Sequence, residues 1–142
     1  MQAINPYLNF NGNAEEAFNF YKSIFGGEFQ MIMRMKDAPE EHRMHAKGEE
    51  LEKIMHIALP IGNGNILMAS DVPESYQKII FGTNFCISIS ADSNQETDKI
   101  FKGLSEGGKI TMPLANTFWG SYFGMCTDKF GIHWMVSHDS NR

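Results

Sequence analysis

Histidine can exchange protons near neutral pH and can bind polar ligands or metals, and His56 has the most informative position of the five histidines. It lies between Met55 and Ile57, in an apolar run that favours a strand. A histidine in such a run is a structural hydrogen-bonding group, a polar group that lines a pocket, or a general base. The sequence leaves these alternatives open, and it offers His56 as the candidate catalytic residue.

Two histidines in a charged segment suggest a different chemistry. His42 and His45 have the spacing H-x-x-H, and Met31, Met33 and Met35 alternate shortly before them. Binding of a soft metal such as copper is one interpretation. We favour the other, in which alternating methionines fill an irregular core or line an adaptable apolar pocket.

The remaining nucleophiles and bases lack the neighbours that catalysis needs. His133 is expected to face outward or towards a partner subunit, and His138 to be solvated. Cys86 and Cys126 share no C-x-x-C spacing and have no adjacent base, so they are expected to be reduced thiols. No G-x-S-x-G motif occurs. The Gly62–Gly64 segment joins two predicted strands, whereas a Rossmann-type S-adenosylmethionine site needs a glycine-rich turn before a helix.

Composition narrows the class of protein. The 142 residues are the length of one domain, and 42% of them are hydrophobic, enough for a packed core. Twelve Lys and Arg against seventeen Asp and Glu give a net charge of −5, without the basic clusters of a nucleic-acid-binding protein. No apolar run approaches the roughly 18–20 residues of a membrane-spanning helix, and no signal-peptide pattern is evident. We expect a cytoplasmic protein with no nucleic-acid or membrane partner.

Hydrophobic periodicity predicts the elements that must position these residues. Apolar side chains at helical spacing follow Asn13 and end at Gly26-Gly27, which predicts a helix over 14–25. Strands are expected at 4–10, 29–35, 54–61 and 65–70, with a hairpin turn at Gly62-Asn63-Gly64. Residues 36–52 are expected to form a long mobile loop, and residues 71–82 a linker.

The pattern then starts again. Strand-like residues 85–90, a helix that begins after Ser93 and ends at Gly107-Gly108, and strands at 109–112, 122–127 and 132–137 repeat the first order of elements. Asn5 and Asn84 are 79 residues apart, Asn13 and Ser93 are 80 apart, and Gly26 and Gly107 are 81 apart. This spacing predicts an α+β chain, 1–142, of two βαβββ modules, 1–71 and 83–139, related by a pseudo-twofold axis and forming a cleft.

Several sequence motifs, together with the repeated βαβββ order, carry a resemblance to a known family. The first motifs are Asn5-Pro6-Tyr7-Leu8, Glu15–Lys22 and Phe25-Gly26-Gly27, and the later ones are Met55-His56, Leu67–Asp71, Phe118-Trp119-Gly120 and Asp128–Trp134. By the first motifs the chain resembles the vicinal oxygen chelate superfamily of glyoxalases, bleomycin-resistance proteins and dioxygenases. By the later ones it resembles the PhnB-like branch, which is often labelled 3-demethylubiquinone-9 3-methyltransferase.

The resemblance implies where a metal site would lie. Enzymes of this superfamily bind one divalent metal through ligands on the first and fourth strands of each module. Those positions fall at Asn5, Met68, Asn84 and Met135 in this sequence. Neutral amides and thioethers are poor ligands for Zn, Ni, Mn or Fe(II). We therefore expect no metal and no cofactor.

A metal-free, small-molecule-binding protein is the function that we expect. Its pocket would be lined by Asn5, Tyr7, His56, Met68, Asn84, Trp119 and Met135. The alternatives are a lyase or isomerase that uses His56 as acid–base, and an interaction domain with an empty cleft. Trp119 covers a pocket mouth or contributes to a core or dimer interface.

The resemblance also implies a homodimer, because family members pair sheet edges and aromatic side chains across a twofold axis. The expected contributors are Phe118, Trp119, Phe123 and Trp134.

Overall fold

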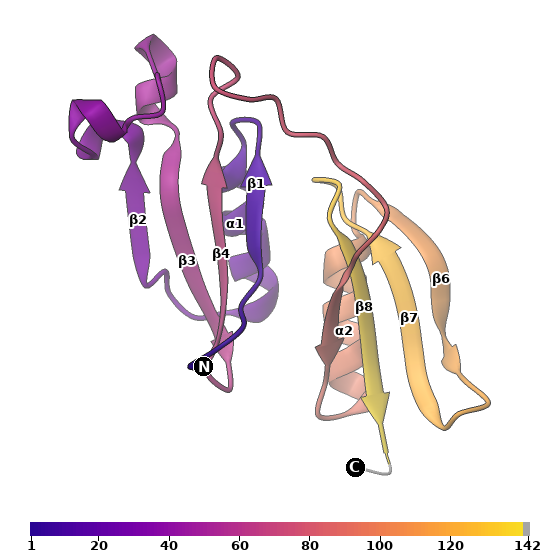
Figure 1. The fold of residues 1–142 in the computed structure, drawn as a ribbon. Coiled ribbons are helices and arrows are strands. Elements are labelled where there is room, and N and C mark those ends of the chain that lie inside the picture. Colours follow the sequence, from indigo (N-terminus) through magenta and orange to yellow (C-terminus); the bar gives the residue numbers. More distant parts are fainter. Residues whose placement is uncertain (141–142) are drawn as a thin grey trace. The chain divides into compact units, whose positions relative to one another are not determined.

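The computed structural model describes residues 1–140 and divides the chain between Ile80 and Phe81 into two compact units. Each unit contains one helix and a four-stranded sheet, and the order of elements in both is βαβββ (Figure 1). The predicted α+β class and the internal repeat are therefore confirmed. None of the helices in residues 1–140 has the length and apolar character that crossing a membrane requires.

The first unit contains β1 (Tyr7–Phe10), α1 (Ala14–Phe25), β2 (Met31–Arg34), β3 (Ile54–Gly62) and β4 (Asn65–Asp71). Its strand order is β1-β4-β3-β2, with β1 parallel to β4 and the other pairs antiparallel. Asn63 and Gly64 have φ of 52° and 77° in the turn between β3 and β4. Positive φ at both central residues defines a type I′ turn, which confirms the predicted hairpin.

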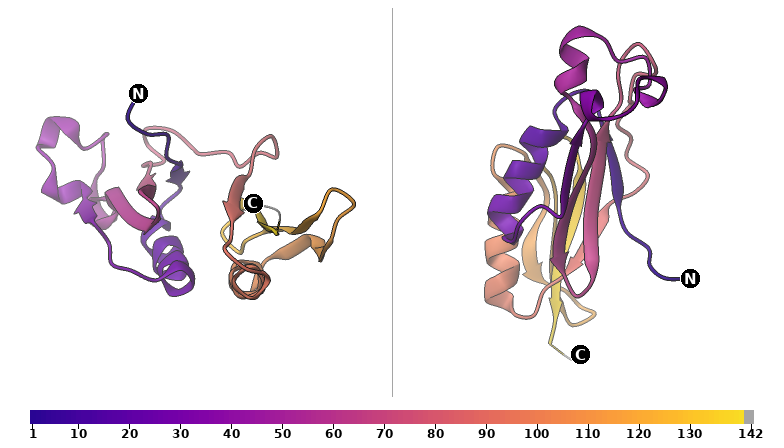
Figure 2. Two further views of the ribbon diagram at one scale, coloured as in Figure 1. Left: turned by 90° about the horizontal axis from the view of Figure 1, so that it is seen from below. Right: turned by 90° about the vertical axis from the view of Figure 1, so that its left-hand side faces the viewer.

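Helix α1 begins and ends at the predicted residues and covers one face of this sheet (Figure 2). The side chains of Ala14, Ala17, Phe18 and Tyr21 are buried, as their helical spacing predicted. They pack on strand residues that alternate along the sheet and are also buried: Leu8, Phe10, Ile57, Leu59, Leu67 and Ala69. Burying each large apolar side chain contributes roughly 1.5–3 kcal/mol, so this layer is the core of the first unit.

The strand residues between these core positions point to the opposite side of the sheet. We call this side the helix-free face of the first unit; its residues are Tyr7, Asn9, Met31, Met33, His56, Ala58, Ile66, Met68 and Ser70.

The segment predicted as a long mobile loop, 36–52, has local structure that the sequence analysis did not predict. This segment contains three 3-10 helices, η1 (Met35–Asp37), η2 (Glu40–His42) and η3 (Gly48–Glu52). The predicted strand at 29–35 also ends early, because the pairing with β3 shifts after Met33 and Met35 turns into the core with no exposed surface. Arg43 stabilises the segment by donating from Nε to the carbonyl of Ala38 and from Nη2 to that of Lys36.

The second unit contains β5 (Ile87–Ser90), α2 (Asn94–Ser105), β6 (Lys109–Asn116), β7 (Ser121–Thr127) and β8 (His133–Asp139), in the sheet order β5-β8-β7-β6. The helix starts as predicted, since the Ser93 hydroxyl accepts a hydrogen bond of 3.0 Å from the backbone N–H of Glu96. Strand β6 is longer than the predicted 109–112, because two irregularities in its pairing with β7 carry it on to Asn116.

The core of the second unit contains Trp134, which the sequence analysis wrongly assigned to a dimer interface. Its side chain has no exposed surface, and its indole N–H donates to Oδ2 of Asp128 at 2.8 Å. Oδ1 of Asp128 accepts the backbone N–H groups of Phe130 and Ile132. Trp134 alternates with Met135 on β8, so the strand register places the tryptophan on the helix side.

Candidate functional site

The helix-free face of the first unit carries methionines on both sides of a small residue. Met31 pairs with Ala58, Ala58 with Met68, and Met68 with Tyr7, so these four side chains form a row across all four strands. Met33 pairs with His56 in the neighbouring row. Ala58 has only a methyl group and lies between two flexible thioether side chains, so the centre of this face is apolar.

Tyr7, at the end of this row, belongs to a group of three polar side chains. The Tyr7 hydroxyl is 3.1 Å from Nδ1 of His56 and also forms a short hydrogen bond with the Ser70 hydroxyl. Ser70 in turn donates to the main-chain carbonyl of Met55 at 2.6 Å. The rings of Tyr7 and His56 are 5.7 Å apart and inclined by 31°. The three side chains come from β1, β3 and β4, so only the folded sheet brings them together.

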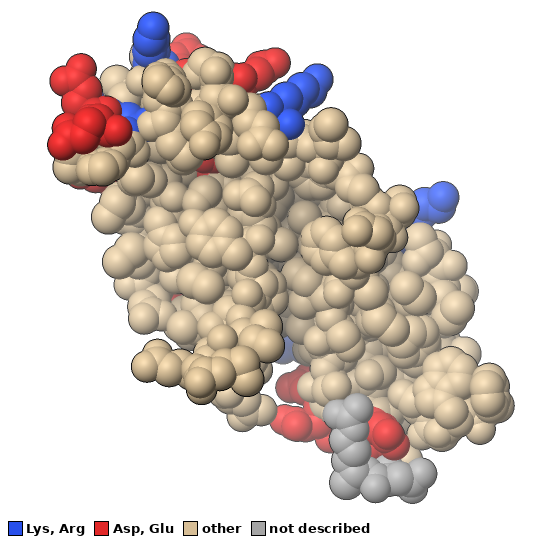
Figure 3. All heavy atoms as spheres, viewed as in Figure 1, with Lys and Arg blue, Asp and Glu red and all other residues tan. Residues whose placement is uncertain are grey.

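This face carries no formal charge. None of its residues is Asp, Glu, Lys or Arg. In Figure 3, whose view shows the strands in front of the helix, the charged side chains of the first unit gather at the end where the 3-10 helices lie. Tyr7 is 45% exposed and Met31 46%, whereas His56 and Met68 are half-buried. The face therefore suits an uncharged or amphipathic organic molecule better than an ion.

The structure places three of the four predicted pocket residues of the first unit together. Tyr7, His56 and Met68 share the helix-free face. Asn5 precedes β1, and its Oδ1 accepts a hydrogen bond of 3.0 Å from the backbone N–H of Ile66. This amide extends the pairing of the two parallel strands and has a structural role.

The predicted residues of the second unit lie along its own sheet. Met135 pairs with Met125 on one side and with Ser88 on the other. Asn84 precedes β5 and is exposed. Trp119, 56% exposed, lies in the turn between β6 and β7, where its ring is 5.8 Å from that of Phe123.

The strand register also bears on the metal ligands implied by the resemblance. On the first strand of each module, the residue paired with the fourth-strand methionine is Tyr7 for Met68 and Ser88 for Met135. It is not Asn5 or Asn84. The Asn5 oxygen already binds a backbone N–H, and neutral amides and thioethers do not suit Zn, Ni, Mn or Fe(II). Within residues 1–140, no three side chains of His, Cys, Asp or Glu are grouped as metal ligands.

Three of the four other histidines have structural partners. Nε2 of His133 is 2.9 Å from the carbonyl oxygen of Gly82, and its Nδ1 is 2.8 Å from the Thr127 hydroxyl. His138, which was expected to be solvated, is half-buried on β8, with Nδ1 2.8 Å from the carbonyl of Ala91. His45 stacks against Tyr76 at 6.4 Å.

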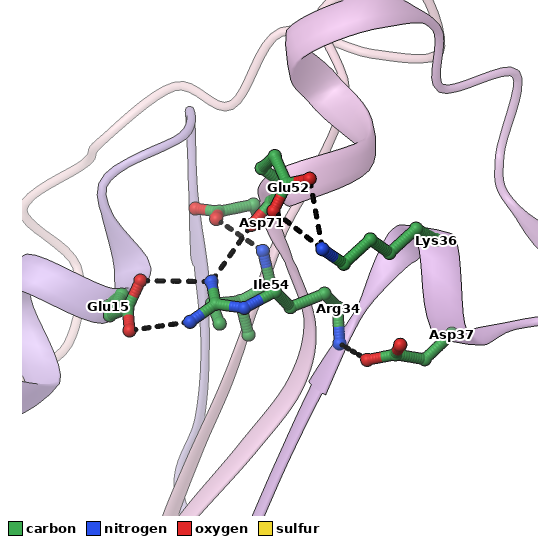
Figure 4. Close-up of polar contacts among 7 residues, drawn as sticks. All are labelled: Glu15, Arg34, Lys36, Asp37, Glu52, Ile54 and Asp71. Atoms are coloured by element: carbon green, nitrogen blue, oxygen red, sulfur yellow. Dashed lines mark hydrogen bonds and ion pairs between the residues drawn. The ribbon is translucent and has the colours of Figure 1, made fainter.

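A second candidate site is a groove of about 760 Å³ where α1, β2 and η3 meet. Its central group is Arg34, whose guanidinium donates to both carboxylate oxygens of Glu15 at 2.8 and 3.0 Å and to the carbonyl of Glu52 at 2.9 Å (Figure 4). These hydrogen bonds lower the pKa of Glu15 and raise that of Arg34. These hydrogen bonds connect Arg34 on β2 to Glu15 on α1 and to Glu52 on η3. We therefore assign Arg34 a structural role.

Sequence reasoning missed Ser70, and it offered Met31 and Met33 as core or pocket residues without placing them in this pocket. Ser70 was recognisable only by its position two residues after Met68, which places both on one face of a strand. Its hydrogen bonds to Tyr7 and Met55 depend on strands that are distant in sequence, and no local pattern indicates them.

Comparison with known proteins identifies similar chains over nearly the whole length. The profile of a family described as 3-demethylubiquinone-9 3-methyltransferase matches residues 2–137. Protein PA1353 from Pseudomonas aeruginosa is 39% identical, with 98% of each chain covered and a TM-score of 0.85. A PhnB protein from Bacillus cereus is 29% identical, with 96% of this chain and 99% of that chain covered and a TM-score of 0.73.

More distant structures share the fold. A glyoxalase/bleomycin resistance protein/dioxygenase family enzyme from Burkholderia phytofirmans is 13% identical, with 96% of this chain and 99% of that chain covered and a TM-score of 0.61. At this identity the likeness concerns the architecture, which agrees with the paired βαβββ modules of this chain.

Proposed function

Since the chain belongs to the PhnB-like 3-demethylubiquinone-9 3-methyltransferase family, within the glyoxalase/bleomycin resistance superfamily, we propose that it is a metal-free protein that binds a small organic molecule on the helix-free face of its first unit. The observation that carries this proposal is the hydrogen-bonded group of Tyr7, His56 and Ser70 beside a row of methionines. An apolar surface with a few convergent polar groups is the usual composition of a ligand site.

The family's description as a methyltransferase is not the activity that we propose. Asn63 and Gly64 form the hairpin turn between β3 and β4, and Gly62 is the last residue of β3. A Rossmann-type site would instead bind the cofactor at the N-terminus of a helix that follows a glycine-rich turn. The absence of metal is proposed from the chemistry of Asn5, Met68, Asn84 and Met135.

A thermal-shift screen of metabolites and antibiotics tests the binding proposal. A ligand at 100 times its Kd adds about 2.7 kcal/mol to the free energy of unfolding. Each hit would be localised from NMR spectra of protein labelled at the methionine methyl groups. Binding should move the Met31, Met33 and Met68 signals. It should weaken in Met68→Gln but not in Met44→Gln, which changes a half-buried methionine of the 36–52 segment. Hits that leave all three signals unmoved contradict the site.

Elemental analysis tests the metal proposal separately. The purified protein should contain well under one Zn, Ni, Mn or Fe per chain, and EDTA should leave its thermal stability unchanged. A stoichiometric metal ion would overturn this part of the proposal.

The alternative function is a lyase or isomerase that uses His56 as acid–base. His56 is the one histidine on the helix-free face of the first unit, which is the observation in its favour. Incubating the protein with each hit and separating the products chromatographically distinguishes the two functions. Conversion of a hit that is lost in His56→Ala would establish an enzyme, and recovery of every hit unchanged supports binding alone.

A further inference from the structure

The hydrogen bonds around Tyr7 can be assigned a direction, because they end on a group that only accepts. The carbonyl oxygen of Met55 has no proton, so the 2.6 Å contact requires the Ser70 hydroxyl to donate to it. Ser70 has one hydroxyl proton, and the hydrogen bond to Met55 uses it. In its contact with Tyr7, Ser70 must therefore be the acceptor.

The same assignment of protons applies to His56. Tyr7 also has a single hydroxyl proton, which goes to Ser70. The 3.1 Å contact between the Tyr7 oxygen and Nδ1 of His56 is then a hydrogen bond only if Nδ1 carries a proton and donates. The series runs from His56 to Tyr7, from Tyr7 to Ser70, and from Ser70 to the backbone of β3.

A neutral imidazole has one N–H and one lone pair, so this arrangement leaves the lone pair on Nε2. No residue in 1–140 forms a hydrogen bond with that nitrogen. We propose that Tyr7 and Ser70 hold His56 in the Nδ1–H tautomer, and that its Nε2 accepts a hydrogen bond from the N–H or O–H group of an uncharged, apolar ligand. This inference rests on the proposed function and names the class of ligand.

The surroundings of His56 favour that class over an anion. Nε2 offers a lone pair, which repels a carboxylate or phosphate oxygen, and the helix-free face has no Lys or Arg to compensate. Met31, Met33 and Met68 offer thioethers, which make favourable contacts with aromatic rings. A phenol is the simplest compound that combines an aromatic ring with a hydroxyl donor.

The tautomer can be measured directly by long-range ¹H–¹⁵N NMR correlation of the histidine rings at alkaline pH. The same spectrum contains two internal controls, because a hydrogen bond to a carbonyl oxygen fixes the tautomer of two other histidines. Gly82 requires a proton on Nε2 of His133, and Ala91 requires one on Nδ1 of His138. His56 should match His138 and differ from His133. An Nε2–H signal for His56 would overturn the proposal.

Two variants test whether Tyr7 and Ser70 are the positioning residues. Ser70→Ala removes the acceptor of the Tyr7 proton, so Tyr7 becomes free to donate to Nδ1 and the Nε2–H form of His56 should increase. Tyr7→Phe removes the partner of Nδ1 and should give a mixture of tautomers. His133 and His138 should not change in either variant. A His56 that stays in the Nδ1–H form in both variants contradicts the positioning role.

Phenol and anisole, which differ by the hydroxyl proton, test the ligand class. In titrations followed by the methyl signals of Met31, Met33 and Met68, phenol should bind about threefold to tenfold more tightly than anisole, the factor expected for one hydrogen bond. His56→Phe should remove the difference. Equal binding of the two compounds overturns this inference but leaves the proposed function standing. If neither compound moves the three signals, the proposed site itself is contradicted.

Discussion

The carboxylate of Asp71, the last residue of β4, accepts a hydrogen bond of 2.9 Å from the backbone N–H of Ala14, the first residue of α1. The same oxygen accepts the N–H of Gly12 at 3.0 Å, and the other carboxylate oxygen accepts the N–H of Ile54 at 2.9 Å. Asp71 is buried. One side chain thus caps α1 and joins the start of β3 to the end of β4.

Replacing this carboxylate should destabilise the first unit. Asp71→Asn places an amide N–H₂ against a backbone donor, so at least one buried N–H loses its acceptor, and the expected loss is about 2–3 kcal/mol in the free energy of unfolding. Urea denaturation measures it. Asp92→Asn, at an exposed aspartate before α2, is the control and should change stability by less than about 0.5 kcal/mol. Equal urea midpoints for Asp71→Asn and Asp92→Asn would contradict the capping role of Asp71.

The ion pair of Glu15 and Arg34 should make stability depend on pH. Hydrogen bonding to Arg34 lowers the pKa of Glu15 in the folded state. Its contribution is therefore complete above the unfolded pKa of about 4.3 and is lost as the pH falls through the lower folded value. Both side chains are partly exposed, so we expect only about 0.5–1 kcal/mol.

Arg34→Met tests this linkage by urea denaturation at pH 7 and at pH 3. The variant should be less stable than the parent at pH 7, and the difference should shrink at pH 3. Lys36→Met breaks the more exposed pair with Glu52 and is the matched control, with a smaller effect. A constant difference between Arg34→Met and the parent at both pH values would exclude Glu15 as the source.

The two cysteines should differ in reactivity. Burial, and secondarily the charge of Asp128, raises the pKa of the Cys126 thiol to about 11. Cys126 is 1% exposed, whereas Cys86 is half-buried. At pH 8 a disulfide reagent should modify one thiol per folded chain, because the thiolate is the reactive form. Cys86→Ser should remove that reaction, and rapid modification of the Cys86→Ser protein would show that Cys126 is accessible.

The homodimer remains a prediction, with Phe118 and Trp119 as its best candidates. Phe118 is 97% exposed, and its ring is 4.9 Å from that of Trp119. Sedimentation at micromolar concentration should give about twice the chain mass of 16.1 kDa. Trp119→Ser should shift the protein towards monomer, and Tyr76→Ser, at an exposed aromatic of the first unit, should not. A monomeric parent protein at that concentration would contradict the prediction.

Most of the fold could be predicted because its signals are local. The apolar spacing of Ala14, Ala17, Phe18 and Tyr21 sets both the extent and the buried side of α1. Asn63 and Gly64 set the hairpin, since few other residues accept positive φ at low cost. The local structure of the segment from 36 to 52 was not predicted because some of its contacts come from residues outside it, such as Arg34 to the carbonyl of Glu52 and Tyr76 to the ring of His45.

The candidate site was only partly predictable. Alternation along β4 could place Met68 and Ser70 on one face. Their partners depend on register: Tyr7 lies opposite Met68 because β1 is parallel to β4, and Met31 reaches the same row through β3. A register shift of one residue would turn these side chains to the other side of the sheet.

The sequence by itself determined the two βαβββ modules, their helices and the hairpin turn of the first module, because helix and turn preferences act over a few residues. Its motifs separately carried the resemblance to the family. The sequence treated Gly26-Gly27 and Gly107-Gly108 as equivalent helix ends. The tertiary structure separates them: Gly26, Gly27 and Gly107 have positive φ, whereas a Cβ on Gly108 would lie 2.2 Å from the carbonyl oxygen of Thr127. Tertiary structure likewise decided the partners of His56, the burial of Trp134 and the role of Asp71. Each of these depends on strands that meet only after folding, and the energy of a hydrogen bond or a close contact is set by distance in space rather than by separation along the chain.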